Sequence, residues 1–176
     1  MRHEMKRHCG CDADFILGCI FGSEAQELKL SLAENPKTNP SLLLLLAKDR
    51  NIHVREAVAL NPSTPQDALE SLSKDDSDVV RSLVAENANV PSELLERLSE
   101  DSECMVRESV ARNPRASSDI LWRLAKDRYT MVRIFVADNP STPKEIVEFL
   151  TESKDEFVKR NALKILEERG ISYEED

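Results

Sequence analysis

A period of 26 residues runs through most of this chain, and it limits what the chain can fold into. Valine recurs once per period, at Val54, Val80, Val106, Val132 and Val158. A basic residue follows each valine, in the series Arg55, Arg81, Arg107, Arg133 and Lys159. Leucine forms a second apolar series, at Leu46, Leu72, Leu98, Leu124 and Leu150. Self-similarity at a fixed period of this length indicates a repeat architecture in which each unit is one supersecondary motif.

Each unit contains two stretches with the apolar spacing of a helix. The first stretch, which we expect to be the longer, begins at Thr64 and carries apolar residues at positions 68, 69 and 72. Thr64 is predicted to cap this helix, with Asp67 completing a capping box, and Thr142 and Glu145 repeat the arrangement.

The second stretch, which we expect to be short, starts at Val54 and ends at an asparagine–proline pair, Asn61-Pro62. A residue before proline is disfavoured in the helical conformation, so this pair should stop the helix. Neither stretch is long enough to be stable alone, so each must bury its apolar stripe against the next unit. The prediction is an all-α helical-repeat solenoid, with five units over residues 28–164, a cysteine-containing cap over 1–27, and a C-terminal cap with an acidic tail over 165–176.

Composition supports a helical protein and disfavours several functions. Four glycines and 5% aromatic residues are poor material for a β-sandwich or for glycine-rich phosphate loops. A net charge of -9 argues against nucleic acid as a partner. The longest fully apolar run, Leu42 to Ala47, is too short to cross a membrane, and the first residues do not resemble a signal peptide. We therefore expect a cytoplasmic protein that does not bind membranes.

The repeated pattern V-R-x-x-V-A-x-N-P-x-T-P-x-x-x-L-x-x-L-x-x-D resembles the leucine-rich repeat variant family over roughly residues 28–164. The resemblance implies a right-handed superhelix in which α-helices alternate with short or 3₁₀ helices. The chain departs from the pattern at Ala88 and Val90, and at residues 164–168, where the last unit lacks its asparagine–proline pair. HEAT-like repeats, which usually have a longer unit and longer helices, are the alternative fold.

Three of the four cysteines, Cys9, Cys11 and Cys19, lie within eleven residues ahead of the repeats. Thiolates are soft ligands suited to zinc or to an iron–sulfur cluster, although ordinary reduced thiols are an alternative. Some leucine-rich repeat variant proteins hold a four-iron, four-sulfur (4Fe-4S) cluster in a small N-terminal domain, and the resemblance implies such a cluster here, with zinc as the alternative. Because such clusters usually take four cysteines, His8, Asp12 or an exogenous ligand would have to complete the set.

Two polar series follow the same period. The arginine series could form a basic stripe for an acidic partner, or it could pair internally with aspartates that recur six residues before each arginine: Asp49, Asp75, Asp101 and Asp127. The asparagine series is interpreted as structural, because side-chain amides at helix ends satisfy backbone groups. Its members are Asn35, Asn61, Asn87, Asn113 and Asn139.

Trp122 stands where sister units carry glutamate, so it is either an exposed partner contact or a packing residue. The sequence contains no phosphate loop, metal-binding helix motif or nucleophile elbow, so we do not expect an enzyme. The favoured function is a scaffold that binds another protein, with Trp122, Arg55, Arg81, Arg107 and Arg133 as candidate contacts. The alternative is an iron–sulfur redox sensor or electron-transfer protein that uses its repeats to dock a partner.

Overall fold

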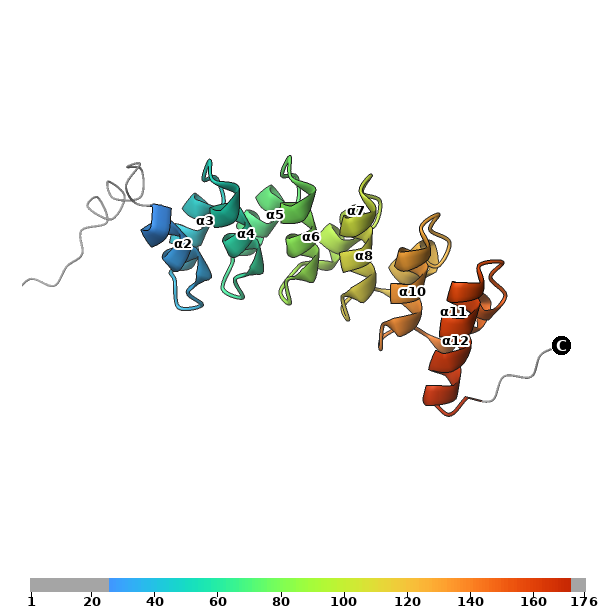
Figure 1. Cartoon of the computed structure of the whole chain (residues 1–176). Helices are drawn as coiled ribbons and strands as arrows, with labels where there is room; N and C mark the ends of the chain where they lie inside the picture. Colours follow the sequence, from blue (N-terminus) through green and yellow to red (C-terminus); the bar gives the residue numbers. More distant parts are fainter. Residues whose placement is uncertain (1–25, 172–176) are drawn as a thin grey trace, which may run out of the picture.

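The structure, a computed structural model, describes residues 26–171, and every regular element in that range is an α-helix (Figure 1). Nine-residue helices form one row, and all but the first carry a member of the valine series: α2 (Gln26–Glu34), α4 (Ile52–Leu60), α6 (Asp78–Glu86), α8 (Cys104–Arg112) and α10 (Thr130–Asp138). Shorter helices carry the leucine series: α3 (Pro40–Leu46), α5 (Gln66–Leu72), α7 (Ser92–Leu98), α9 (Ser118–Leu124) and α11 (Lys144–Thr151). The last helix, α12 (Glu156–Glu168), has 13 residues and carries Val158, the final member of the valine series.

The predicted helical-repeat solenoid is confirmed, with one difference in detail. The valine helix is the longer of the pair and the leucine helix is the shorter, which reverses the expected lengths. Of the two forms that the family resemblance implied, short or 3₁₀, the described range shows a short α-helix. Both helices are nevertheless short enough to depend on packing against neighbouring units.

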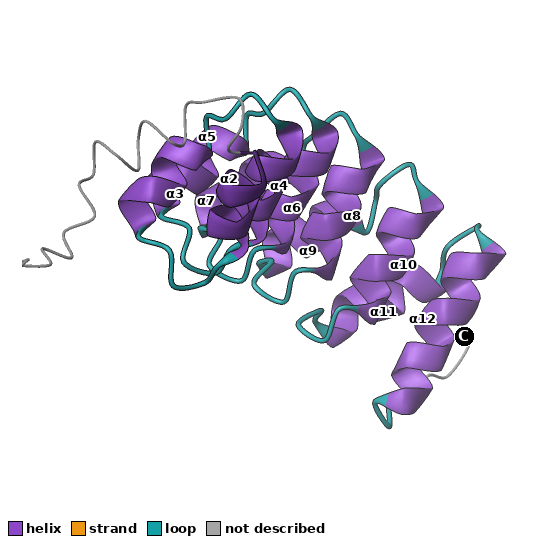
Figure 2. Ribbon diagram, turned by 60° about the vertical axis from the view of Figure 1, so that its left-hand side comes forward, coloured by secondary structure: helices purple, strands orange, loops and turns teal. Residues whose placement is uncertain are grey.

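Units follow one another in chain order from α2 to α12 and form an elongated array (Figures 1 and 2). Each nine-residue helix packs directly against the nine-residue helices of the units before and after it, and the short helices flank this row. All members of the valine and leucine series are buried, with at most 1% of each residue exposed. Burying a side chain of this size contributes about 1.5–3 kcal/mol, so the apolar series supply the main cohesion between units.

The predicted capping boxes are wrong. Pro65 and Pro143, not the preceding threonines, occupy the N-cap positions of α5 and α11. The hydroxyl of Thr64 instead donates a 2.6 Å hydrogen bond to the carbonyl of Val58, and Thr142 donates an equal bond to Val136. Both acceptors lie in the last turn of the preceding nine-residue helix, where they also accept the backbone N–H of Asn61 or Asn139. The threonine therefore completes the end of one helix and does not begin the next.

The asparagines form a ladder that joins consecutive units. The side-chain amide of Asn61 donates to the carbonyls of Ala33 (2.6 Å) and Asn35 (3.0 Å), both in the preceding unit. Its side-chain oxygen accepts a hydrogen bond from the Ser63 N–H at 2.8 Å. The prediction that these amides satisfy backbone groups is therefore confirmed. The equivalent hydrogen bond to an alanine carbonyl of the preceding unit is made by Asn87, Asn113 and Asn139.

The C-terminal end of the array finishes this ladder with a different residue. Helix α12 runs through the expected boundary between residues 164 and 165, so the last unit and the expected cap share one helix. After that helix, the guanidinium of Arg169 donates to the carbonyls of Asn139 (3.0 Å) and Thr142 (2.8 Å). Arg169 thus supplies to the Asn139 carbonyl the donor that an asparagine of a following unit would otherwise supply. No helix in the described part of the chain is long and apolar enough to span a membrane.

Candidate functional site

The outward side of the nine-residue helices carries exposed apolar side chains at a repeated position. The residue immediately before each valine is apolar in four consecutive units: Val79, Met105, Met131 and Phe157. These four are 37%, 39%, 46% and 71% exposed, respectively. A recurring exposed apolar position is unexpected on a solvated surface, and contiguous apolar patches mark interaction sites. We call the surface formed by the outward sides of α2, α4, α6, α8, α10 and α12 the stacked-helix face.

Helix geometry extends this apolar surface sideways. Residues four and seven positions after Val79 lie on the same stripe of α6, and they are Leu83 and Glu86. In α4 the corresponding residues are Ala57 and Leu60, and Leu60 is 53% exposed. The face is therefore more than one side chain wide between α4 and α6.

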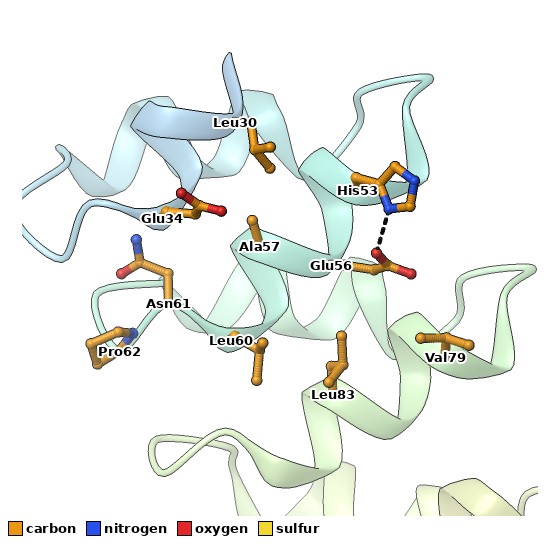
Figure 3. A pocket seen from close by; sticks show the side chains of 10 residues that line it. All are labelled: Leu30, Glu34, His53, Glu56, Ala57, Leu60, Asn61, Pro62, Val79 and Leu83. Carbon is orange, nitrogen blue, oxygen red and sulfur yellow. Dashed lines mark hydrogen bonds and ion pairs between the residues drawn. The ribbon is translucent and has the colours of Figure 1, made fainter. Parts of the chain in front are cut away.

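A depression of about 540 Å³ lies on the stacked-helix face between α2, α4 and α6 (Figure 3). Apolar side chains make up much of its lining: Leu30, Ala57, Leu60, Val79 and Leu83. Three ionisable residues, Glu34, His53 and Glu56, also line it, and none of its ten lining residues is lysine or arginine. The imidazole of His53 lies 2.9 Å from the carboxylate of Glu56, as the dashed line in Figure 3 shows. This end of the face combines apolar surface with acidic side chains.

Further along the face the charges are mixed. Glu86 accepts a 2.9 Å hydrogen bond from the hydroxyl of Ser109. Arg112 stacks its guanidinium 3.6 Å from the centre of the Phe135 ring, and Arg112 occupies the repeat position of Glu86. Beyond them, Asp138 accepts a hydrogen bond from Asn161. The acidic character of the face is therefore concentrated at the α2–α6 end.

The arginine series pairs inside the array and forms no open basic stripe. Arg55 binds both carboxylate oxygens of Asp75, at 2.6 and 3.0 Å, and donates to the carbonyl of Asp49 at 2.9 Å. Arg81 and Arg107 make the same contacts, with Asp101 and Asp127 as their carboxylate partners.

The side chains of Arg55, Arg81, Arg107 and Arg133 are only 8–18% exposed. Arg133 forms its ion pair with Asp155 (2.8 Å). In the first unit, Lys29 forms the equivalent ion pair with Asp49 (2.9 Å).

Of the two alternatives for the arginines, internal pairing is the one observed, but its register differs from the expectation. The carboxylate comes from the aspartate 20 residues later, in the following unit, while the aspartate six residues earlier offers its backbone carbonyl. Burial raises the pKa of the Asp75 carboxyl, but the hydrogen bonds from Arg55 and from the Ser77 N–H outweigh it and leave that pKa below its ordinary value. The pKa of Asp101 and that of Asp127 are lowered in the same way. These pairs tie each unit to the next.

Trp122 lies on the row of short helices, away from the apolar positions of the nine-residue helices. It is half-buried and meets Phe149 edge-on, with ring centroids 5.4 Å apart. The ammonium of Lys126 lies 5.6 Å from the Trp122 ring and 5.9 Å from the Phe149 ring. The side chain thus packs between α9 and α11 while keeping part of its surface in solvent.

The predicted metal ligands Cys9, Cys11 and Cys19 lie outside the described residues, as do His8 and Asp12. Within residues 26–171, no group of three or more histidine, cysteine, aspartate or glutamate side chains could hold a metal ion. Cys104, the remaining cysteine, is a free, half-buried thiol at the start of α8.

The stacked helices and their ladders define a helical-repeat solenoid. The family model described as "Leucine rich repeat variant" matches residues 52–77, a stretch that begins at α4 and spans one full period. The repeat unit at residues 52–77 thus matches the family that the sequence pattern resembles. No curated protein matches the chain.

The stacked-helix face was missed at the sequence level, although a signal for it was present. The valine and leucine series drew attention because they repeat without exception, whereas the position before the valine varies among histidine, valine, methionine and phenylalanine. The exposure of this position could have been predicted from helix geometry. The position directly precedes a buried valine, and the residue four positions later lies on the same outward side of the helix.

Proposed function

We propose that this protein is a non-enzymatic scaffold that binds another protein through the stacked-helix face. The observation that carries the proposal is the run of exposed apolar side chains at one repeat position, Val79, Met105, Met131 and Phe157. Methionine and aromatic residues are enriched at protein interfaces relative to the rest of the surface. A repeat array also presents an extended surface whose binding side chains are independent of its core. Helical-repeat families of this kind generally bind and do not catalyse.

A charge placed on the face tests this proposal. Met131 is 46% exposed, so Met131→Lys should leave the fold intact while placing an ammonium in the proposed interface. Leu45 offers a matched control, because it is 45% exposed and lies on the short helix α3. Both variants, with the wild type, would be used to capture the partner from the cells that make the protein.

Met131→Lys should reduce the retained partner by about tenfold or more, as expected for loss of a central interface contact. Leu45→Lys should retain it. If both variants retain the partner equally, or if Leu45→Lys alone loses it, the stacked-helix face is not the docking surface.

We also propose an N-terminal metal centre, of the 4Fe-4S type or with zinc, held by Cys9, Cys11 and Cys19. The spacing of these three cysteines in the sequence supports it. With such a centre, the repeats would serve as the docking arm of a redox protein. Analysis of the purified protein for iron, sulfide and zinc tests this second proposal separately from the first.

A further inference from the structure

We infer that the depression between α2, α4 and α6 binds one amphipathic helix of the partner, with basic side chains flanking the apolar stripe of that helix. The inference rests on the proposed docking function and names the chemistry of the partner. Three features of the face support it: the spacing of its units, the width of its apolar surface and the sign of its charge.

The spacing of the units suits a helix laid along the array. Packed helices lie about 8–10 Å apart, so equivalent side chains of α2, α4 and α6 recur at about that interval along the face. A partner helix advances about 10.5 Å in seven residues, so one apolar side chain per heptad meets each successive unit. Side chains on one face of an extended strand recur every 6.6–6.8 Å or so, and would fall out of step with the units.

The apolar surface is wide enough for a helix to rest on. Val79 and Leu83 come from one turn of α6, while Ala57 and Leu60 come from one turn of α4. Together with Leu30 of α2 they form a floor contributed by three consecutive units (Figure 3). A helix with its side chains is about 10–12 Å across and buries a stripe, not a single row, so a floor of this kind matches it.

The charge of the depression selects a basic helix. Glu34 and Glu56 line it, while lysine and arginine are absent from its ten lining residues. The chain as a whole carries a formal charge of -9, which speeds the approach of a cationic partner. Glutamates at the border of an apolar floor are placed to meet lysines or arginines that flank an apolar stripe.

A synthetic peptide provides the test. The probe is a fluorescein-labelled leucine/lysine peptide of about 18 residues, roughly five helical turns. Two further peptides have the same length: one has every lysine replaced by glutamate, and the other has the same composition in an order without a helical stripe. Binding to the full chain is followed by fluorescence anisotropy. The leucine/lysine helix should bind at least about tenfold more tightly than either of the others, a difference of about 1.4 kcal/mol.

Matched variants locate the binding on the protein. Leu60→Lys should weaken the leucine/lysine peptide by about tenfold, while Leu45→Lys, on a short helix, should not. The double change Glu34→Gln with Glu56→Gln should weaken it several-fold. Its control is Glu70→Gln with Glu93→Gln, which removes the same charge from a second acidic depression, between α5 and α7. Circular dichroism of each variant confirms that the array is folded.

Several results would overturn the inference. The glutamate peptide or the unstriped peptide could bind as tightly as the leucine/lysine helix, or the α5–α7 control could weaken binding as much as the Glu34 and Glu56 change. If no peptide binds while partner capture still depends on Met131, a basic helix is not the ligand of the depression, but the stacked-helix face remains the docking surface. Capture that is indifferent to Met131→Lys would reject the docking function itself.

Discussion

The side-chain nitrogen of Asn87 lies 2.6 Å from the carbonyl oxygen of Ala59, which is 28 residues earlier in the chain and belongs to the preceding unit. The same nitrogen donates to the carbonyl of Asn61 at 3.1 Å, and the side-chain oxygen accepts from the N–H of Asn89 at 2.8 Å. One buried amide therefore serves three backbone groups, two of them across a unit boundary. Polar contacts as well as apolar packing hold neighbouring units in register.

Replacing this amide should be costly. Asn87→Ala removes the hydrogen bonds to the Ala59 carbonyl and from the Asn89 N–H, and it leaves the Asn61 carbonyl with only its bond from the Thr64 N–H, so we expect the free energy of unfolding to fall by about 2–4 kcal/mol. Urea denaturation followed by circular dichroism measures the change. Asn35 provides the control, because it is exposed and its side chain accepts one exposed hydrogen bond from the Lys37 N–H. Asn35→Ala should cost less than about 1 kcal/mol, and equal losses for the two variants would contradict the ladder.

The arginine–aspartate pairs should make the array sensitive to acid. Burial raises the pKa of Asp101, but hydrogen bonds from Arg81 and from the Glu103 N–H outweigh it, so the pKa of the folded state lies below the ordinary value. A lowered carboxyl pKa contributes stability that is present above the unfolded-state pKa and is lost as the pH falls through the folded-state pKa. We expect urea midpoints to be steady above about pH 5 and to fall progressively below about pH 4.

The variant Asp101→Asn should reduce this acid dependence, because one of the three similarly paired carboxyls, Asp75, Asp101 and Asp127, is removed. It should also lower stability at neutral pH, because Arg81 loses its bidentate partner. Wild-type acid dependence in this variant would show that the pair has no role in it.

Trp122 should contribute to stability through its contact with Phe149. Trp122→Ala should cost about 1–3 kcal/mol, less than for a fully buried aromatic residue, because the side chain is only half-buried. A double-mutant cycle with Phe149→Ala should give a coupling of about 0.5–1.5 kcal/mol for the edge-on pair. We expect partner capture by folded Trp122→Ala to match the wild type. A large loss of capture at unchanged stability would instead make Trp122 a partner contact.

Several of these features were predictable from the sequence, and the remainder depended on contacts between units. The burial of Val80 and Leu98 followed from periodicity, because an unbroken apolar series has to face the neighbouring unit. The role of Thr64 did not follow, since its competing acceptor, the Val58 carbonyl, is apparent only once both helices are packed.

The register of the arginine pairs was ambiguous for an arithmetic reason. In a 26-residue repeat, an aspartate that lies six residues before one arginine also lies 20 residues after the arginine of the preceding unit. The sequence alone therefore cannot distinguish Asp49 from Asp75 as the carboxylate partner of Arg55. The packing of neighbouring units decides between them, because it brings the Asp75 carboxylate against the Arg55 guanidinium.

The N-terminal cysteines predict a metal centre that elemental analysis can detect. Thiolates as close in sequence as Cys9, Cys11 and Cys19 are stabilised together when a metal deprotonates and neutralises them. Protein purified without oxygen should contain iron and sulfide, or zinc, in a fixed ratio to the chain. Serine at any of the three positions should abolish that content, and Cys104→Ser should preserve it. A metal-free wild-type preparation would leave these residues as ordinary thiols.

Docking on the stacked-helix face is tested most directly by site-specific photocrosslinking in the cells that make the protein. A photoreactive phenylalanine analogue would replace Met105 or Met131 on the face, and Leu45 or Ser71 on the exposed side of the short helices. We expect positions 105 and 131 to give an adduct of the same mass, identified as one protein, and positions 45 and 71 to give none. Adducts formed at positions 45 and 71 with none at 105 and 131 would contradict the account.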